Sequence, residues 1–353
     1  MLSVCHVSPT YFAPESVLGG GERYAEELAR AMSARAQVKL VSFGPVEKRE
    51  GRSRSFERVI LRSWTRDKMA PFSPALFAEL EDQAVVHCHQ YRVLPTFLAA
   101  AFAARHGQRV FVSDLGGSGW GPSWWVEQAR WVDGLLPISR YAAASAPALG
   151  LPSRVIGGGV DLERFPMRPR PEHDGSLVFL GRLLPHKGVH FLLEALPPGR
   201  ALHVVGTVAD PAYRTRLERL AAGKDVRFHT GLEDSAVVAL LQRAMALVHP
   251  TPVDARGDAG NAELFGLVLA EAMACGCPVV ASRAASLPEI VEHGVNGLLV
   301  PPNQPAAQRE AIEYLAASPD RWQELSLAAR RHAETELSWS RVVDRCLAAY
   351  AES

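Results

Sequence analysis

Two glutamates are the only charged side chains in an apolar, helix-favouring stretch of this 353-residue sequence. They are Glu263 and Glu271, eight residues apart in GNAELFGLVLAEAMACGCPVV at 260–280. A strand-like run precedes them, so Glu263 is expected near a helix start, where unpaired N–H groups and the positive dipole end lie. If all eight steps are helical, the carboxylates are about 12 Å apart along the axis and about 80° apart around it. Such a pair suits the two ends of an elongated polar ligand. A dipole-stabilising glutamate followed by a solvated one explains it equally well.

A second charged group follows another strand-like run, SLVFLG at 176–181. Arg182 comes directly after this run, and Lys187 stands five residues further on, before the next helical pattern. Two cations that converge at a strand end are what a diphosphate leaving group needs, because they neutralise the negative charge that develops on it. Taken alone, the pair is better explained as two solvated loop cations.

Histidines and an aspartate end two strand-like runs in the N-terminal half. His87 and His89 lie on one side of VVHCHQYR at 85–92, because alternate residues of a strand face the same way. They could bind a metal, but the local sequence offers no third ligand, and packed, hydrogen-bonded histidines are the alternative. Asp114 ends RVFVSD at 109–114 and is a candidate hydroxyl ligand or base. No D-x-D motif occurs and no His/Asp/Glu cluster has metal-ligand spacing, so no metal is expected.

Three further features of this half could contact ligands. Gly20 and Gly21, in LGGGERYAEE at 18–27, precede a helical pattern and would let a ligand approach the backbone closely. Trp120 belongs to a tryptophan-rich stretch at 119–131 whose rings suit a sugar or a lipid boundary, although helix packing explains part of it. Residues 48–68 hold eight Lys/Arg against three acidic residues. This excess could meet anionic lipid or a phosphate-bearing acceptor, but a solvated loop is favoured.

The elements that carry these residues alternate between strands and helices, which predicts parallel sheets with right-handed crossovers. The N-terminal series has strands in 2–9, 38–43, 84–90, 109–114 and 134–139, and helices in 21–32 and 94–107. The second series has strands in 176–181, 201–206, 226–231, 246–251, 278–282 and 297–302. A Gly/Pro-rich linker at about 157–175 separates the two series, and two amphipathic helices end the chain. We expect domains at 1–160 and 161–336, with a helix at 337–353 that packs back on the N-terminal domain.

Composition excludes several classes of protein. The 38 basic and 38 acidic residues balance, and no basic stripe with interleaved aromatics argues for nucleic acid. Five scattered cysteines without a C-x-x-C pair favour a reducing cytoplasm over a disulfide framework. No apolar run is long enough for a membrane span, and no signal-peptide layout is present. We expect a cytoplasmic protein, with peripheral contact to the inner face of the membrane left open.

The stretch ELFGLVLAEAMACGCPVVAS…LPEIVEHGVNGLLVPP resembles the donor-binding signature of family 4 (group 1) retaining glycosyltransferases. The similarity extends over most of the chain and is strongest at 176–302. It implies the GT-B fold, with two Rossmann-like doubly wound domains facing across a cleft. Ala284-Ala285 stands where the family has a glycine pair, and the segment before Glu263 is longer than usual, so the resemblance does not fix the identity of the donor.

The resemblance also implies roles for individual residues. Glu271 would hold the ribose hydroxyls of a nucleotide sugar and Glu263 those of the transferred hexose. The remaining donor contacts would come from the cations, the helix-start amides and the glycine loop, namely Arg182, Lys187, Phe265, Gly266, Leu267, Gly20 and Gly21. His89 would act near the transferred sugar, and Asp114, His87 and Trp120 would lie on the acceptor side. Arg182 and Lys187 would replace the metal of other transferases, so the nucleoside diphosphate sugar is a co-substrate and no cofactor is expected.

The sequence thus favours an enzyme that moves a hexosyl unit to a hydroxyl acceptor with retention, in polysaccharide, glycolipid or other glycoconjugate synthesis. A retaining glycosidase needs its two carboxyl groups about 5–5.5 Å apart, which residues two helical turns apart do not normally provide. A non-catalytic nucleotide-sugar-binding protein would not need His89 or the glycine loop. A nucleotide-sugar epimerase of the same fold is disfavoured by the resemblance alone. The base, the sugar and the acceptor stay open.

Overall fold

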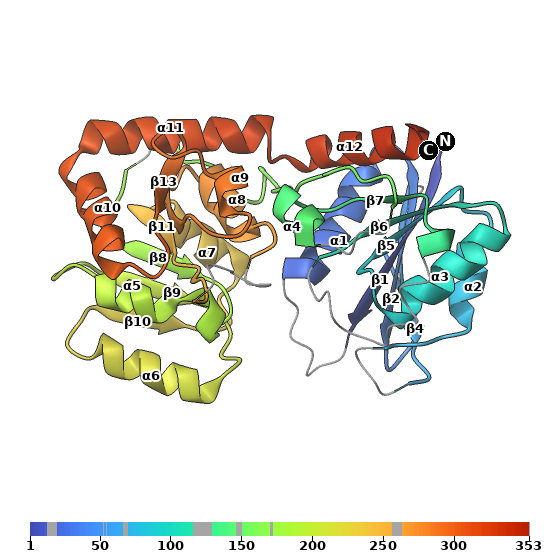
Figure 1. Ribbon diagram of the computed structural model, residues 1–353, viewed down its shortest axis with the longest axis horizontal. Helices are drawn as coiled ribbons and strands as arrows, with labels where there is room; N and C mark the ends of the chain where they lie inside the picture. Colours follow the sequence, from blue (N-terminus) through green and yellow to red (C-terminus); the bar gives the residue numbers. More distant parts are fainter. Residues whose placement is uncertain are drawn as a thin grey trace. The chain divides into compact units, whose positions relative to one another are not determined.

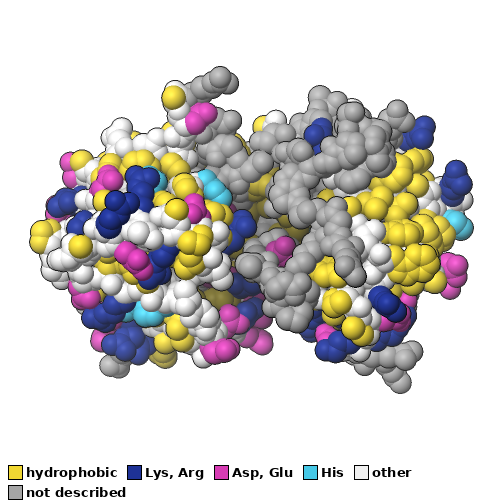
Figure 2. Space-filling model, turned by 90° about the horizontal axis from the view of Figure 1, so that it is seen from below, with side chains coloured by type: hydrophobic (Ala, Val, Ile, Leu, Met, Phe, Trp, Pro, Cys, Tyr) yellow, Lys and Arg dark blue, Asp and Glu magenta, His cyan; other side chains and the backbone are white. Residues whose placement is uncertain are grey.

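The computed structural model describes residues 1–12, 20–51, 53, 55–65, 70–115, 129–145, 150–169, 172–255 and 263–352. The chain forms two compact units, one of Met1–Gly159 with Trp339–Ser353 and the other of Val160–Ser338. Each contains one sheet (Figure 1). On the face drawn in Figure 2, basic side chains are interspersed with acidic ones, in keeping with the zero net charge of the sequence.

The sheet of the first unit has the strand order β3-β4-β2-β1-β5-β6-β7, and only the β3–β4 pair is antiparallel. Its strands are β1 (Ser3–Tyr11), β2 (Gln37–Gly44), β3 (Lys48–Glu50), β4 (Phe56–Arg62), β5 (Val85–His89), β6 (Arg109–Ser113) and β7 (Gly134–Leu135). Its helices are α1 (Gly20–Met32), α2 (Ala75–Leu80), α3 (Leu94–Arg105), α4 (Arg140–Ser145) and α12 (Trp339–Glu352). The expectation of a solvated loop at 48–68 is wrong, because β3 and β4 lie in this segment.

Helices cover both faces of this sheet. Alternate residues of β1 and β5, such as Cys5 and Cys88, belong to one apolar cluster with α2 and α3. The residues between them face α1 and α12, two helices from opposite ends of the chain that lie side by side (Figure 1). The Trp339 indole of α12 donates to Glu27 of α1 over 2.8 Å. Gly159 leaves room for this indole, since a Cβ there would lie 2.4 Å from the Trp339 ring.

The second unit has a six-stranded parallel sheet in the order β10-β9-β8-β11-β12-β13. Its strands are β8 (Leu177–Leu180), β9 (Leu202–Val205), β10 (Val226–His229), β11 (Ala246–His249), β12 (Val279–Ser282) and β13 (Gly297–Val300). Its helices are the 3₁₀ turn η2 (Pro185–Lys187), α5 (Val189–Ala195), α6 (Pro211–Ala221), α7 (Asp234–Leu241), α8 (Leu267–Ala274), α9 (Leu287–Ile290), α10 (Pro305–Ala317) and α11 (Pro319–Thr335). All six strands predicted from the sequence are confirmed.

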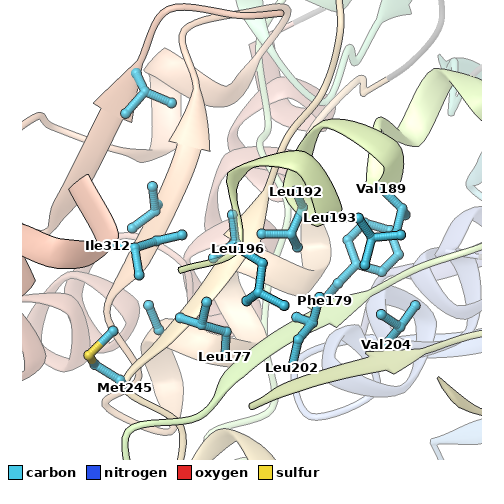
Figure 3. Close-up of a cluster of buried hydrophobic side chains, with 14 of the residues drawn as sticks. Leu177, Phe179, Val189, Leu192, Leu193, Leu196, Leu202, Val204, Met245 and Ile312 are labelled. Carbon is cyan, nitrogen blue, oxygen red and sulfur yellow. The ribbon is translucent and has the colours of Figure 1, made fainter. Parts of the chain in front are cut away.

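The core of the second unit forms between the sheet and its helices (Figure 3). Leu177 and Phe179 of β8 are fully buried and belong to one cluster with Leu192 and Leu193 of α5. Because each such side chain contributes roughly 1.5–3 kcal/mol on burial, this contact fixes α5, and the η2 turn before it, against the sheet.

Both sheets are doubly wound. Numbered within each unit, and with the short β3 left out, the strand order is 3-2-1-4-5-6 in both. In such sheets the order reverses between the first and fourth strands, and ligands bind beyond the carboxyl ends of these two strands. The reversal falls between β1 and β5 in the first unit and between β8 and β11 in the second.

Candidate functional site

In the second unit, the reversal point of the sheet brings together three side chains. Lys187 follows β8, His249 ends β11, and Glu263 precedes α8. The Lys187 Nζ and the His249 Nε2 both lie 2.8 Å from the Glu263 Oε2. A carboxylate only accepts hydrogen bonds, so both nitrogens donate to this one oxygen.

The Glu263 carboxyl stays ionised although its side chain is only 14% exposed. Burial alone would raise its pKa, but the Lys187 ammonium and the His249 hydrogen bond outweigh burial and hold the pKa well below its usual range. Its backbone is fixed as well, because the Ser286 hydroxyl donates to the Glu263 carbonyl over 3.0 Å. Glu263 is therefore a positioned, negatively charged acceptor for hydrogen bonds.

A glycine brings Lys187 to this carboxylate. Gly188 has φ +71°, and a Cβ there would lie 1.9 Å from the Pro250 carbonyl oxygen. Only glycine accommodates both this left-handed backbone and so close an approach of two chains. The turn η2 thus packs directly against the segment that follows β11, and this contact puts the Lys187 ammonium beside Glu263.

Arg182 supplies a second cation on the same segment. Its side chain is exposed, and no ion pair of Arg182 is found within the part of the chain that the structure describes. The nearby His186 imidazole responds to both positive charges. Burial lowers its pKa most, and the charges of Lys187 and Arg182 lower it further. The segment between β8 and α5 therefore concentrates positive charge beside the Glu263 carboxylate.

The helix after Glu263 begins later than the sequence analysis assumed. Gly266 takes φ +99° as the N-cap residue, and α8 starts at Leu267. Four of the eight steps from Glu263 to Glu271 precede the helix, so the helical spacing calculated for the two carboxylates is wrong. Phe265 is buried just before the cap, and Glu271, at 6% exposed, is not the solvated helix residue of the alternative interpretation.

In the first unit, three buried histidines meet at the reversal point of the sheet. His6 of β1 is paired in register with His87 of β5, and His89 ends β5 on the same face. All three side chains are fully buried. Burial lowers the pKa of His6 and of His87 well below the usual value and the pKa of His89 to about 3, so all three imidazoles are neutral.

Hydrogen bonds fix which nitrogen of His89 carries its proton. The His6 Nε2 lies 3.4 Å from the Met32 sulfur, which can only accept, so this nitrogen is protonated. In a neutral imidazole the His6 Nδ1 must then accept, and its partner, the His89 Nε2 at 3.0 Å, must donate. The His89 Nδ1 is left as an acceptor, and among the described residues this buried atom has no hydrogen-bond partner.

This cluster bears on the expected absence of a metal. One ring nitrogen from each of His6, His87 and His89 lies within 4.8 Å of the others, so a neighbouring strand supplies the third ligand that the local sequence lacks. The His87 nitrogens, however, bond to the Tyr350 hydroxyl at 2.6 Å and the Ser113 hydroxyl at 2.8 Å. His6 and His89 also share a hydrogen bond, so a metal held by all three rings would have to replace existing hydrogen bonds of His6 and His87.

The remaining predicted residues of this unit are placed as follows. Gly20 and Gly21 form the first turn of α1 rather than a loop before it, and a Cβ on Gly21 would lie 3.6 Å from the Leu115 side chain. Asp114 directly follows β6 and is partly buried. Trp120 lies outside the described residues.

Sequence reasoning missed His6, His249 and Ser286. His6 and His249 both lie within strands that the sequence predicts, and His249 is the last residue of β11, the strand that precedes Glu263. The rule that ligands bind beyond the carboxyl ends of parallel strands could have singled out His249. His6 could not be found this way, because its role depends on the pairing of β1 with β5.

Superposition on known structures identifies the fold of this chain. The whole chain superposes on sucrose-phosphate synthase from Thermosynechococcus elongatus with a TM-score of 0.76 and 19% identity, covering 99% of this chain and 98% of that one. It also superposes on HepE from Anabaena in complex with UDP, with a TM-score of 0.74, 16% identity and 100% coverage of both chains. These likenesses show the GT-B fold, two parallel-sheet α/β domains.

Two family models match consecutive parts of the sequence, "Glycosyltransferase Family 4" over residues 18–164 and "Glycosyl transferases group 1" over residues 163–332. The chain therefore belongs to the group 1, or family 4, glycosyltransferases. It is 34% identical over 216 residues to the D-inositol 3-phosphate glycosyltransferase of Saccharomonospora viridis, a match that covers 57% of this chain and 50% of that one. The chain spans about half the length of the curated relatives it matches.

Proposed function

We propose that this protein is a retaining glycosyltransferase that moves a hexosyl unit from a nucleoside diphosphate sugar to a hydroxyl acceptor. The observation that carries the proposal is the arrangement at the reversal point of the second sheet. There an ionised Glu263 is held by Lys187 and His249, with Arg182 on the same segment. A fixed acceptor for sugar hydroxyls beside two cations for a diphosphate matches what a nucleotide sugar presents.

The chemistry follows from these charges. The bond from the anomeric carbon to the diphosphate breaks, and the acceptor oxygen bonds to that carbon on the face that the leaving group vacates. The acceptor proton passes to a phosphate oxygen of the departing diphosphate. Arg182 and Lys187 stabilise the charge on the diphosphate, and the Lys187 ammonium has three protons, so it can bind a phosphate without releasing Glu263.

The other assigned residues complete the proposal. Glu263 orients hexose hydroxyls, Glu271 accepts from the ribose hydroxyls, and the N–H groups at Phe265, Gly266 and Leu267 face the donor at a helix start. In the first unit, a sugar hydroxyl that donates to the His89 Nδ1 would satisfy an acceptor whose burial otherwise costs about 1–3 kcal/mol. Gly20 and Gly21 would approach the donor phosphates, and Asp114 would bind an acceptor hydroxyl.

A melting experiment with UDP, GDP, ADP and dTDP, each with Mg²⁺ or with EDTA, tests donor binding. UDP is tried first because HepE was solved with it. A nucleotide at 100 times its Kd adds roughly 2.7 kcal/mol of stability. We expect one nucleotide to raise the melting temperature equally with Mg²⁺ and with EDTA, since the two cations do the work of a metal.

Glu271→Ala should abolish the shift and Glu310→Ala, on the exposed side of α10, should keep it. Equal shifts in both variants would remove the ribose role of Glu271.

Turnover of the corresponding nucleotide sugar separates an enzyme from a binding protein. We expect release of the nucleoside diphosphate to slow by about 100-fold in Arg182→Ala and in Lys187→Ala, the usual loss for one stabilising donor. A wild-type protein that binds the nucleotide sugar but releases no diphosphate would be the non-catalytic alternative. An epimer of the donor sugar among the products, detected by chromatography, would indicate the epimerase instead.

A further inference from the structure

The first unit contains a pocket on the same edge of the sheet as His89. Its volume is 650 Å³, and it is lined by Tyr11, Pro45, Arg62, Ser63, Trp64 and Thr65. Tyr11 ends β1, Pro45 follows β2, and Arg62 ends β4, so the pocket lies beyond the carboxyl ends of three neighbouring strands. This is the edge of a doubly wound sheet at which ligands bind.

The charge in this pocket comes from Arg62. The segment 48–68 is rich in basic residues, and four of them are described, namely Lys48, Arg49, Arg58 and Arg62. Lys48 pairs with a glutamate of its own strand, and Arg49 and Arg58 form salt bridges with glutamates of neighbouring elements. Arg62 is exposed, and within the described ranges no ion pair of Arg62 is found. Among the four described basic residues of this segment, the one without an ion pair to a described carboxylate therefore lies at the pocket.

The pocket also holds an exposed aromatic ring in a fixed position. Trp64 is 71% exposed, which is unusual for so large an apolar side chain. Its backbone N–H donates to the Phe72 carbonyl over 2.7 Å, and the centroids of its ring and the Phe72 ring lie 6.1 Å apart in a T-shaped arrangement. The Thr65 hydroxyl donates to the Ala70 carbonyl over 2.9 Å. These contacts hold Trp64 and Thr65 against Phe72 and Ala70, so the exposed indole is a platform for the apolar face of a ring.

A glycine next to the pocket allows the segments that line it to come close together. Gly44 ends β2, and a Cβ there would lie 2.9 Å from the Phe12 carbonyl oxygen and 3.0 Å from the Ile60 side chain. The Ser63 N–H donates to the Gly44 carbonyl over 2.9 Å. The chain segments that follow β1 and β4 thus converge on β2, which brings Tyr11, Arg62 and Trp64 around one space.

The strand order relates the pocket to His89. The β1 strand lies between β2 and β5, and neighbouring strands are about 4.8 Å apart. A ligand bound over β4, β2 and β1 needs to extend by only one strand to reach the end of β5, where His89 lies. We infer that this pocket binds the acceptor of the proposed transfer, and that the acceptor is a sugar or cyclitol ring carrying a phosphate or carboxylate. Arg62 holds the anionic group, and Trp64 packs on the ring.

This inference rests on the proposed function, and binding of phosphorylated rings tests it. Calorimetric titrations would compare glucose 6-phosphate and inositol 1-phosphate with glucose, inositol and inorganic phosphate. We expect at least one phosphorylated ring to bind about tenfold tighter than both its uncharged parent and phosphate alone. Arg62→Gln should remove this tenfold preference, and Trp64→Ala should weaken the binding of phosphorylated ring and parent alike. Arg105→Gln, an exposed arginine at the end of α3, is the matched control and should change neither.

Vesicles distinguish the two sources of such a ligand. Sedimentation with phosphatidylinositol vesicles but not with phosphatidylcholine vesicles, lost in Arg62→Gln, would support a lipid headgroup as the acceptor. Binding of the free phosphorylated rings alone would support a soluble acceptor. The inference is overturned if neither form binds, or if Arg62→Gln and Arg105→Gln weaken binding equally. Arg62→Gln should leave the melting shift by nucleotide intact, whereas a wild-type protein that no nucleotide stabilises would contradict the proposed function instead.

Discussion

At the scale of single residues, the two candidate sites use opposite means to prepare a buried polar group. Glu263 is kept charged, because Lys187 and His249 offset the cost of its burial. His89 is kept neutral, because burial lowers the pKa of its imidazole to about 3. The first group offers a fixed charge to hydroxyl protons, and the second offers a lone pair on Nδ1 that no described residue uses.

The protonated nitrogen of His89 can be observed directly. With [¹⁵N]histidine-labelled protein, a long-range proton–nitrogen correlation spectrum separates protonated from bare ring nitrogens, and His89→Asn assigns the signals. We expect the proton of His89 on Nε2 and a bare Nδ1, because the Met32 sulfur forces His6 to accept from His89. Met32→Leu removes that constraint and should produce a mixture of both tautomers. A wild-type His89 with its proton on Nδ1 would contradict the derivation and the acceptor role with it.

At the scale of elements, the sequence predicted every strand of the second unit, because five of the six are short, mainly apolar runs buried on both faces. The sixth, β10, is partly exposed and is marked by its place in the strand–helix alternation. The sequence missed β4, whose polar residues make the segment look solvated until their partners are known. Arg58 of β4, for example, pairs with Glu26 of α1. The spacing of Glu263 and Glu271 was misjudged because the positive φ of Gly266 delays the helix start. Apolar runs are thus visible in the sequence, whereas tertiary pairing and a single unusual φ are not.

The contact between η2 and the segment after β11 predicts a large effect of one methyl group. Gly188→Ala would place a Cβ 1.9 Å from the Pro250 carbonyl oxygen at φ +71°, so the two segments must separate. We expect a loss of about 3 kcal/mol or more in the free energy of unfolding of the second unit. The nucleotide-induced melting shift should fall too, since Lys187 would move away from Glu263.

Gly199→Ala is the matched control for this prediction. Gly199 has nearly the same φ, +72°, but a Cβ there meets nothing within 4 Å. Gly199→Ala should therefore lower the free energy of unfolding by only about 1–2 kcal/mol, the cost of the left-handed backbone, and leave nucleotide binding unchanged. Equal losses in both variants, measured by calorimetry, would mean that the contact with Pro250 does not hold the turn.

At the scale of the whole molecule, two units share one winding order, and each places its candidate residues where that order reverses. The sequence predicted the two α/β series and the linker between them from apolar periodicity and from Gly and Pro content. It could not show that His6 completes a cluster with residues more than 80 positions away, because that requires the register of β1 on β5. Among the described residues, no helix is both long and apolar enough to cross a membrane.

The buried histidines make the stability of the molecule depend on pH. Below pH 6.5 an unfolded histidine binds a proton that the folded His6, His87 and His89 do not, because burial lowers the pKa of each. Unfolding then takes up protons, so the free energy of unfolding falls as the pH drops below about 6.5, by about 1.4 kcal/mol per pH unit for each such histidine. Glu263 adds nothing in this window, since its lowered pKa preserves its contribution until far lower pH.

Calorimetry between pH 7.5 and 5 should therefore show the first unit melting at lower temperatures as the pH falls. The second unit should respond in the same direction, because burial lowers the pKa of His190 to about 4 and also lowers the pKa of His173, His186, His203 and His332. Replacing a cluster histidine, as in His87→Gln, should remove about one proton from the uptake on unfolding of the first unit. A melting temperature that stays constant or rises between pH 6.5 and 5 would show that the three histidines are protonated in the folded protein, and the neutral network that holds His89 would then be wrong.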